Sequence, residues 1–237
     1  EQLRYLEHNI SSKIIFCEKP LFDTKQNLHI VNNQVFVGYV LRFHPLLQKM
    51  KSCLQNEKII SIHAKCGQYL PLWRPCRDYR DSYSAKKNEG GGVLLDLSHE
   101  IDYVQWIGGV LKDIKSYQMH ISDLEIDSDD LAMMIGKTCD GVVVNISVDY
   151  ISKITHRRLF VDTEVHSYEL DFIGNTLVIN NKMQNKLIHQ TPTPSLQRND
   201  TFKAMHQDIL TEHKYACTLK EGLQTMETIS VVQRQNQ

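Results

Sequence analysis

The chain has 237 residues, of which 41% are hydrophobic and 23% are charged, so it can bury a core as one large domain or two small ones. Its formal net charge of -1 excludes the basic field that a nucleic-acid or anionic-membrane partner requires. No apolar run is long enough to cross a membrane, and six cysteines without paired spacing indicate reduced thiols in a cytoplasm. We therefore expect chemistry on a small molecule, or protein contacts.

The first segment combines helices and strands. Residues 1–9 resemble a short helix, and the apolar runs 14–17 and 34–40 predict two strands. Asp23 followed by Gln26 predicts a short capped helix between the strands. Strand, helix and strand with continuous apolar runs are typical of a parallel sheet covered on both faces, which two strands do not complete.

The next segment is predicted as helix, strand, long loop and helix. Pro45 stands at the start of the first helix, and residues 59–66 form the strand. The polar and aromatic stretch 67–92 is a loop, and residues 95–109 form the second helix. A loop of that length in a compact domain is usually functional.

The second half of the chain is predicted to be an antiparallel sheet followed by helices. Period-two alternation and turn signals predict hairpins that turn at 140–141 and 174–175. The stretch 190–200 contains two prolines in a polar setting and is a surface loop. The tail is helical, with a capping box formed by Thr218 and Glu221.

The first candidate for chemistry is the sequence Glu18-Lys19-Pro20 at the end of the strand 14–17. Ligands of open α/β sheets bind beyond the carboxyl ends of strands, so Lys19 brings a cation to that place. Proline prevents the strand from continuing. The alternative is a solvated acid and lysine in an ordinary turn.

The second candidate follows three glycines at 90–92. Asp96, His99 and Asp102 are three residues apart, so they are predicted to share one face of a helix. A carboxylate beside a histidine favours the imidazolium and orients it, which is typical of a proton carrier. The alternative is a helix start rich in acids, as the helix dipole favours, with a histidine on the surface.

The long loop offers a third candidate. The side chains that suit the binding of a sugar phosphate or a carboxylate are Arg74, Arg77, Arg80, Tyr79 and Tyr83, although such residues also occur on the rims of sites without contacting a ligand. His63 and Cys66 are three residues apart on a strand and point to opposite faces, so we expect no metal site.

Five segments in this order resemble the glucose-fructose oxidoreductase, inositol dehydrogenase and MocA-like family of NAD(P)-dependent oxidoreductases. They are EKPLF (18–22), GYVLRFHP (38–45), GGGVLLDLSHEIDYVQWIGG (90–109), HRRLFVDTE (156–164) and TLKEGLQTMETI (218–229). The loop YLPLWRPCRDYRDSYSAKKNEGGG (69–92) resembles the branch that works on sugars and nucleotide sugars.

The resemblance implies three catalytic residues. Lys19 matches the lysine that bonds the reacting hydroxyl or carbonyl, and His99 matches the general acid and base. Asp96 matches the carboxylate that precedes this histidine. Here the chain departs from the family, because two residues separate Asp96 from His99 where three are common.

The resemblance also implies binding residues and a cofactor, NAD or NADP. Glu18, Lys19 and Pro20 are expected beside the cofactor. The expected contacts to a sugar-like substrate are made by Arg42, Arg74, Arg77, Tyr83 and Asp102.

The fold class expected from the resemblance is α/β plus α+β. Residues 1–42 are the C-terminal remnant of a parallel Rossmann sheet, and residues 43–237 form a domain with an open, mainly antiparallel sheet covered by helices on one face. The family's Gly-x-Gly-x-x-Gly fingerprint is absent, so about 90 to 120 residues of a full-length enzyme are expected before Glu1.

Three functions stay open. The chain belongs to an oxidoreductase acting on a hydroxyl of a sugar-like substrate, or it is a non-catalytic assembly domain, or it is related to enzymes that cleave glycosidic bonds through a transient oxidation. The open sheet needs a cover, so a homodimer or tetramer formed through it is expected.

Overall fold

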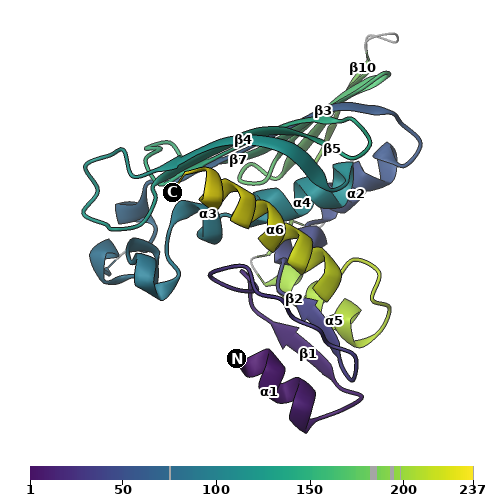
Figure 1. Ribbon diagram of the computed structural model, residues 1–237. Coiled ribbons are helices and arrows are strands. Elements are labelled where there is room, and N and C mark those ends of the chain that lie inside the picture. Colours follow the sequence, from purple (N-terminus) through teal and green to yellow (C-terminus); the bar gives the residue numbers. More distant parts are fainter. Residues whose placement is uncertain (75, 182–185, 193–194, 198, 237) are drawn as a thin grey trace.

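The computed structural model describes residues 1–237 except 75, 182–185, 193–194, 198 and 237. In this described part, two sheets are joined by helices (Figure 1). The larger sheet has eight strands, which are in spatial order β10 (Lys186–Gln190), β9 (Thr176–Asn181), β8 (His166–Asp171), β7 (His156–Thr163), β3 (Ile59–Gly67), β6 (Val143–Asp149), β5 (Leu131–Thr138) and β4 (Leu111–Met119). The smaller has three, in the order β1 (Ile14–Cys17), β2 (Gln34–Val37) and β11 (Cys217–Thr218).

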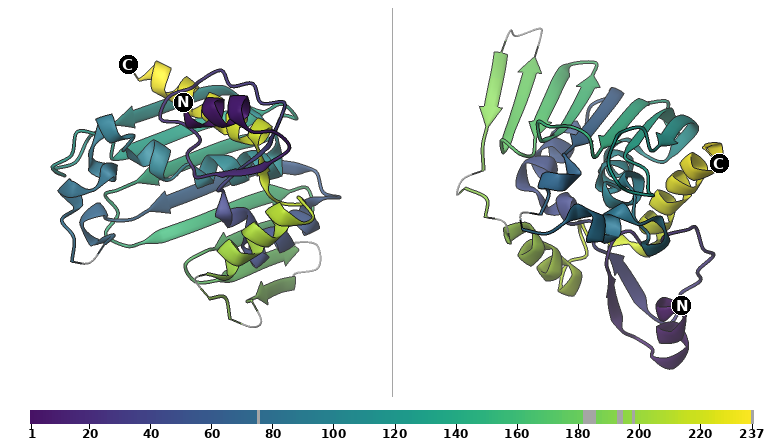
Figure 2. Two further views of the ribbon diagram at one scale, coloured as in Figure 1. Left: turned by 90° about the horizontal axis from the view of Figure 1, so that it is seen from below. Right: turned by 90° about the vertical axis from the view of Figure 1, so that its left-hand side faces the viewer.

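Helices lie on one face of the large sheet, and the small sheet lies on the far side of these helices (Figures 1 and 2). The helices on this face are α2 (Pro45–Leu54), α3 (Val93–Asp96), α4 (His99–Gly108) and α6 (Leu219–Gln235). α5 (Asp200–Leu210) packs on the 3-10 turn Val40–Phe43, and α1 (Gln2–Asn9) lies beside the small sheet (Figure 1). Short 3-10 turns occur at η1 (Val40–Phe43), η2 (Leu70–Leu72), η3 (Tyr79–Asp81), η4 (Tyr83–Ala85) and η5 (Lys87–Glu89). The expected fold class is therefore confirmed.

The small sheet begins with the two predicted strands. β1 and β2 pair in parallel, with Ile15 opposite Val35. The predicted helix after Asp23 is wrong, because the Asp23 carboxylate accepts a bond from the next backbone N–H and forms a turn. The chain then runs without helix or strand to β2. The Glu7 carboxylate fixes the end of this stretch by accepting hydrogen bonds from the backbone N–H groups of Val31 and Asn32 at 2.8 and 2.7 Å.

The C-terminal part of the chain returns to the small sheet. β11 pairs antiparallel with β2, and α6 follows directly. The predicted capping box is present, since Thr218 and Glu221 bond to each other's backbone N–H groups. One hydrophobic core runs from Leu3 in α1 to Val232 in α6. The division into domains 1–42 and 43–237 stays a prediction.

Both predicted hairpins of the large sheet are confirmed. Gly141 turns the chain between β5 and β6 with a φ of +84°, and Asn175 turns it between β8 and β9 with a φ of +50°. Left-handed backbone of this kind favours glycine and asparagine. Of the predicted loop 190–200, residues 193–194 and 198 lie outside the described part, and the rest contains no strand or helix between β10 and α5.

The two faces of the large sheet differ in burial. Val144 and Ile146 of β6 are 1% and 0% exposed against the helices. On the opposite face Ile135 and Val143 are 59% and 51% exposed, and no helix covers that face in the described part of the chain (Figure 1). All six cysteines are free thiols. Among the described helices, none is both long and apolar enough to cross a membrane.

Candidate active site

Lys19 lies just beyond the carboxyl end of β1, which ends at Cys17. Its Nζ donates a hydrogen bond to the backbone carbonyl oxygen of Asp96 at 2.5 Å. Burial lowers the pKa of Lys19, and the negative charge of Asp96 opposes that shift. The bond joins the end of a strand in the small sheet to the end of α3, so the two sequence candidates meet at one place.

His99 is the first residue of α4, and its ring is partly exposed. The ring meets that of Tyr39 edge-on, with the centroids 5.6 Å apart. Its Nδ1 is buried and has no hydrogen-bond partner among the described residues. Burial lowers the pKa of His99 well below 6.5, and the charges of Lys19 and Arg157 lower it further. The imidazole is therefore neutral at neutral pH and lies close to the Lys19 ammonium.

The prediction that carboxylates flank His99 on one helical face is wrong. The helix is interrupted between α3 and α4, and Leu97 and Ser98 stand at the break. The break separates Asp96 from His99, and the Asp96 carboxylate accepts a bond from Tyr150. Asp102 shares α4 with His99, but its carboxylate is paired with Arg42. Cations, and not carboxylates, dominate the field at the imidazole, so the group is a proton acceptor at neutral pH and not a preformed imidazolium.

The Asp96 side chain is 5% exposed, and its Oδ2 accepts a hydrogen bond from the Tyr150 hydroxyl at 2.5 Å. Tyr83 also interacts with this carboxylate. Burial and the negative charge of Asp96 raise the pKa of Tyr83 to about 12. Asp96 thus contacts Lys19 through its carbonyl oxygen and two tyrosines through its carboxylate, which holds it in place beside the site.

Arg157 and Glu100 belong to the same surroundings, although sequence reasoning gave them no role. Arg157, on β7, places its Nε 2.9 Å from Glu100 Oε1, and Glu100 is fully buried. The Tyr103 hydroxyl donates to the same oxygen at 3.2 Å. Arg157 lies in the HRRLF segment and Glu100 follows His99 in the chain, but an arginine on a strand has no spacing that marks it as a site residue.

The expectation that Arg42 and Asp102 bind substrate is not supported, because the two side chains are buried against each other. Arg42 donates through Nε and Nη2 to the two carboxylate oxygens of Asp102 at 2.9 and 2.7 Å. Both side chains are 2% exposed. A third bond runs from Arg42 Nη1 to Glu221 at 2.9 Å. We therefore interpret this pair as part of the scaffold that holds α4.

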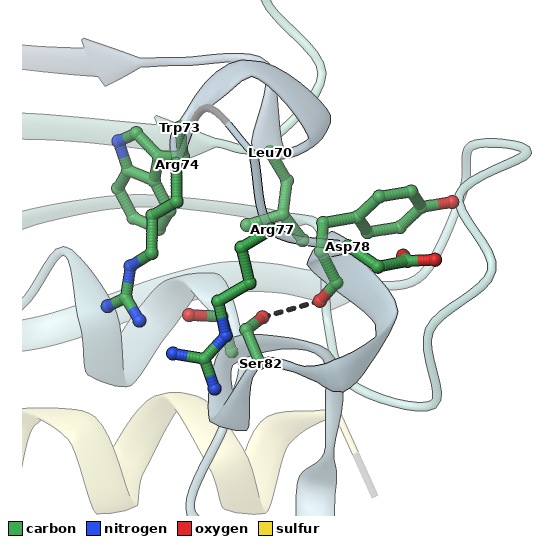
Figure 3. Close-up of a pocket in the computed structure, with 8 residues that line it drawn as sticks. Leu70, Trp73, Arg74, Arg77, Asp78 and Ser82 are labelled. Carbon is green, nitrogen blue, oxygen red and sulfur yellow. Dashed lines mark hydrogen bonds between the residues drawn. The ribbon is translucent and has the colours of Figure 1, made fainter.

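Arg74, Arg77 and Tyr83 lie in the long loop, and all three side chains are exposed. Figure 3 shows the two arginines extending in the same direction, whereas Asp78 points away from them. The Arg74 guanidinium carbon is 5.6 Å from the centre of the Tyr83 ring. The loop candidates are thereby connected to Asp96 through Tyr83, and their contact with a substrate stays a prediction.

The family implies a nicotinamide cofactor, and the residues of this chain fit its reacting end. Glu18 is exposed and Pro20 partly exposed, on either side of Lys19 at the end of a parallel strand. The neutral His99 and its unpartnered Nδ1 lie nearby. The glycine fingerprint that would bind the cofactor pyrophosphate is absent from this sequence.

A metal site is not seen in the part of the chain that the structure describes, where no group of three or more His, Cys, Asp or Glu side chains surrounds a common point. On β3, His63 is exposed and Cys66 is buried, so they point to opposite faces as expected.

The family model for the GFO/IDH/MocA C-terminal domain matches residues 48–169. No curated protein sequence matches the chain. Solved structures share the fold. UDP-N-acetylglucosamine 3-dehydrogenase GnnA from Acidithiobacillus ferrooxidans is 17% identical, with a TM-score of 0.66 over 84% of this chain and 60% of its own.

Two further structures cover more of the chain. Levoglucosan dehydrogenase in complex with NADH and levoglucosan is 15% identical, with a TM-score of 0.77 over 93% of this chain and 71% of its own. An oxidoreductase domain protein from Kribbella flavida is 17% identical, with a TM-score of 0.75 over 93% and 71%. At these identities the likeness shows the fold, and this chain spans only part of each neighbour.

Proposed function

Because the chain belongs to the GFO/IDH/MocA family, we propose that it forms the substrate side of an NAD(P)-dependent oxidoreductase that acts on a hydroxyl or carbonyl of a sugar-like molecule. The observation that supports the proposal is the hydrogen bond from Lys19 Nζ to the Asp96 carbonyl oxygen, which ties Lys19 to the segment before α4, where burial and the Lys19 charge lower the pKa of His99. Two residues 80 positions apart are brought together at the carboxyl end of a parallel strand, where ligands of such sheets bind.

The two groups have complementary roles in the oxidation of an alcohol. Lys19 donates a hydrogen bond to the reacting oxygen and stabilises the negative charge that develops on it. His99 is neutral because of burial and its cationic neighbours, so it accepts the hydroxyl proton. A bound nicotinamide supplies the hydride acceptor. In the reverse direction, the protonated His99 returns the proton to the carbonyl oxygen.

Glu18, Lys19 and Pro20 are the residues of this chain that would adjoin the nicotinamide. The pyrophosphate would be held by a glycine-rich segment of the kind that precedes this region in the family, which this sequence does not include. NADH is bound in the levoglucosan dehydrogenase structure, which favours NAD without deciding between NAD and NADP here. The free cysteines favour a cytoplasmic enzyme.

The test combines cofactor binding with turnover. It uses the protein that contains this chain and a cofactor-binding segment. NAD or NADP should raise the thermal midpoint of this protein, since a ligand that binds only the folded state stabilises it. Lys19→Ala and His99→Ala should each abolish turnover while leaving that stabilisation nearly unchanged. Lys13→Ala and His63→Ala are matched controls, because both side chains are exposed away from the site. Normal turnover in either site variant removes its proposed role.

A second proposal concerns assembly. The face of the large sheet opposite the helices exposes apolar side chains on neighbouring strands, which are Tyr117 (69%), Met133 (43%), Ile135 (59%) and Val143 (51%). Contiguous apolar surface of this kind favours a partner, and a second copy of the chain is the one we propose, as a homodimer or within a tetramer. Such an interface is compatible with catalysis on the other face.

A further inference from the structure

The three arginines of the loop between β3 and α3 differ in their ion pairing. Arg80 is neutralised, with its Nη2 at 2.6 Å from Asp78 Oδ2 and its Nη1 at 3.2 Å from Glu125 Oε1. Arg74 and Arg77 are exposed and form no ion pair with a carboxylate in the described part of the chain. The loop thus supplies acids for one arginine and leaves the other two positive.

The two unpaired arginines lie together. They are three residues apart in sequence, and Figure 3 shows their guanidinium groups extending on the same side of the loop, away from Asp78. Both line a small cavity whose floor includes Leu70 and Trp73. Side by side, two like charges repel each other, and an anion bound between them removes that repulsion.

This positive pair adjoins the candidate active site. The Arg74 guanidinium lies 5.6 Å from the Tyr83 ring, and Tyr83 lies against the Asp96 carboxylate, whose charge raises its pKa. The carbonyl oxygen of Asp96 accepts the bond from Lys19 at 2.5 Å. Asp96 and Tyr83 therefore connect Lys19 to Arg74 through consecutive contacts.

We propose that Arg74 and Arg77 form a subsite for a phosphate or diphosphate group carried by the substrate. The inference rests on the proposed function, since it names the class of sugar that the Lys19 and His99 site would take. A guanidinium binds two oxygens of an anion at once. A phosphoryl group offers three or more oxygens and more negative charge than a carboxylate, so it suits two adjacent arginines better.

Binding is measured first without turnover, with inorganic pyrophosphate as the probe. Pyrophosphate should raise the thermal midpoint of the protein in a concentration-dependent manner, and added salt should weaken the effect. Malonate, a dicarboxylate, and glucose, an uncharged sugar, should give smaller shifts. Arg74→Ala, Arg77→Ala and the double variant should lose most of the pyrophosphate shift.

The matched control is Arg80→Ala, which removes one positive charge from the same loop but from an arginine that is already neutralised. It should keep the pyrophosphate shift. Equal losses in Arg80→Ala and Arg77→Ala would mean that net charge alone is measured, and an unchanged shift in the double variant would place the anion elsewhere. Either result overturns the subsite, as does the absence of any shift in the original protein.

Turnover then separates this inference from the proposed function. With sugars tested as matched pairs with and without a phosphate ester, the double variant should raise KM at least tenfold for the phosphorylated member only. Pyrophosphate binding that depends on Arg74 and Arg77, without any cofactor-dependent turnover, would retain the anion subsite and remove the oxidoreductase. Turnover with an equal KM for both sugars in the original protein and the double variant would retain the oxidoreductase and overturn the subsite.

Discussion

Arg42 and Asp102 form a two-point ion pair inside the protein, with Nε at 2.9 Å from Oδ2 and Nη2 at 2.7 Å from Oδ1. Arg42 also bonds Glu221 at 2.9 Å, and its guanidinium carbon lies 5.3 Å from the centre of the Trp106 ring. One side chain from η1 therefore fixes α4, which begins at His99, and the start of α6.

The first prediction is that Asp102→Asn lowers the free energy of unfolding by about 3 to 5 kcal/mol, because Arg42 then loses its buried counter-charge. Urea denaturation followed by circular dichroism measures the loss. Asp78→Asn is the control: it removes an acid from the exposed pair with Arg80 and should cost far less stability, because solvent screens that pair. Similar losses in the two variants would show that the buried pair does not anchor α4.

The sequence predicts the helices and strands better than it predicts the role of this ion pair. Periodicity predicts the elements well, since the alternation around Val144 follows directly from which face of a strand is buried. The resemblance implied that Arg42 and Asp102 bind substrate. Sequence cannot separate this role from a structural one, because a charged residue near a motif shows the same pattern whether it faces a ligand or the core. Their pairing joins segments 60 residues apart and depends on tertiary packing.

Part of the candidate site was predictable for a definite reason. Lys19 ends a strand and His99 follows a glycine run, and both features have local signals. Arg157 has no such signal, since it becomes a neighbour of His99 only when β7 pairs with β3. The interruption between α3 and α4 was missed because the spacing of Asp96 and His99 suits a continuous helix.

The second prediction concerns Tyr150, whose hydroxyl donates to Asp96 at 2.5 Å. Tyr150→Phe leaves the buried carboxylate short of a donor and should cost about 1 to 3 kcal/mol of stability. It should also lower turnover, because Asp96 holds Lys19. Tyr168→Phe is a matched control. Tyr168 lies on β8, outside the site, and its hydroxyl donates a hydrogen bond to Glu57 at 2.5 Å. This variant should lose stability and keep turnover.

The third prediction tests the open face of the large sheet. Ile135→Asp places a charge at the centre of the exposed apolar row and should shift the protein to monomers in sedimentation at micromolar concentration. Ile154→Asp is the control, because Ile154 is 82% exposed in a connection outside the strands. Monomers in the unchanged protein, or equal association in both variants, would contradict assembly through this face.

The fourth prediction concerns the cations that act on His99. Removal of the Arg157 charge in Arg157→Gln should raise the pKa of His99, because one of its two positive neighbours is lost. Arg157→Lys keeps the charge and should change the pKa less. Titration of the His99 ring signal by NMR measures both, with circular dichroism to verify folding, because Glu100 loses its partner. An unchanged pKa in Arg157→Gln would show that the Arg157 charge does not contribute to the shift.

The fifth prediction is a loss of stability as the pH falls below 6.5. The pKa of His99 in the folded protein lies below its ordinary value of 6.5, so in acid the unfolded chain binds a proton that the folded protein does not. Stability is then fully present above 6.5 and decreases toward the folded pKa, by at most about 1.4 kcal/mol per pH unit for this group. His99→Gln should flatten the dependence of the unfolding free energy between pH 7 and 5.

The buried His44 contributes in the same direction, since burial lowers its pKa as well, so part of the slope should persist in His99→Gln. His63→Gln alters an exposed ring and should leave the slope unchanged. Urea denaturation at a series of pH values measures all three proteins. An equal slope in His99→Gln and in the original protein would show that His99 takes up its proton in the folded state. The neutral imidazole that accepts the substrate proton would then be absent in mild acid.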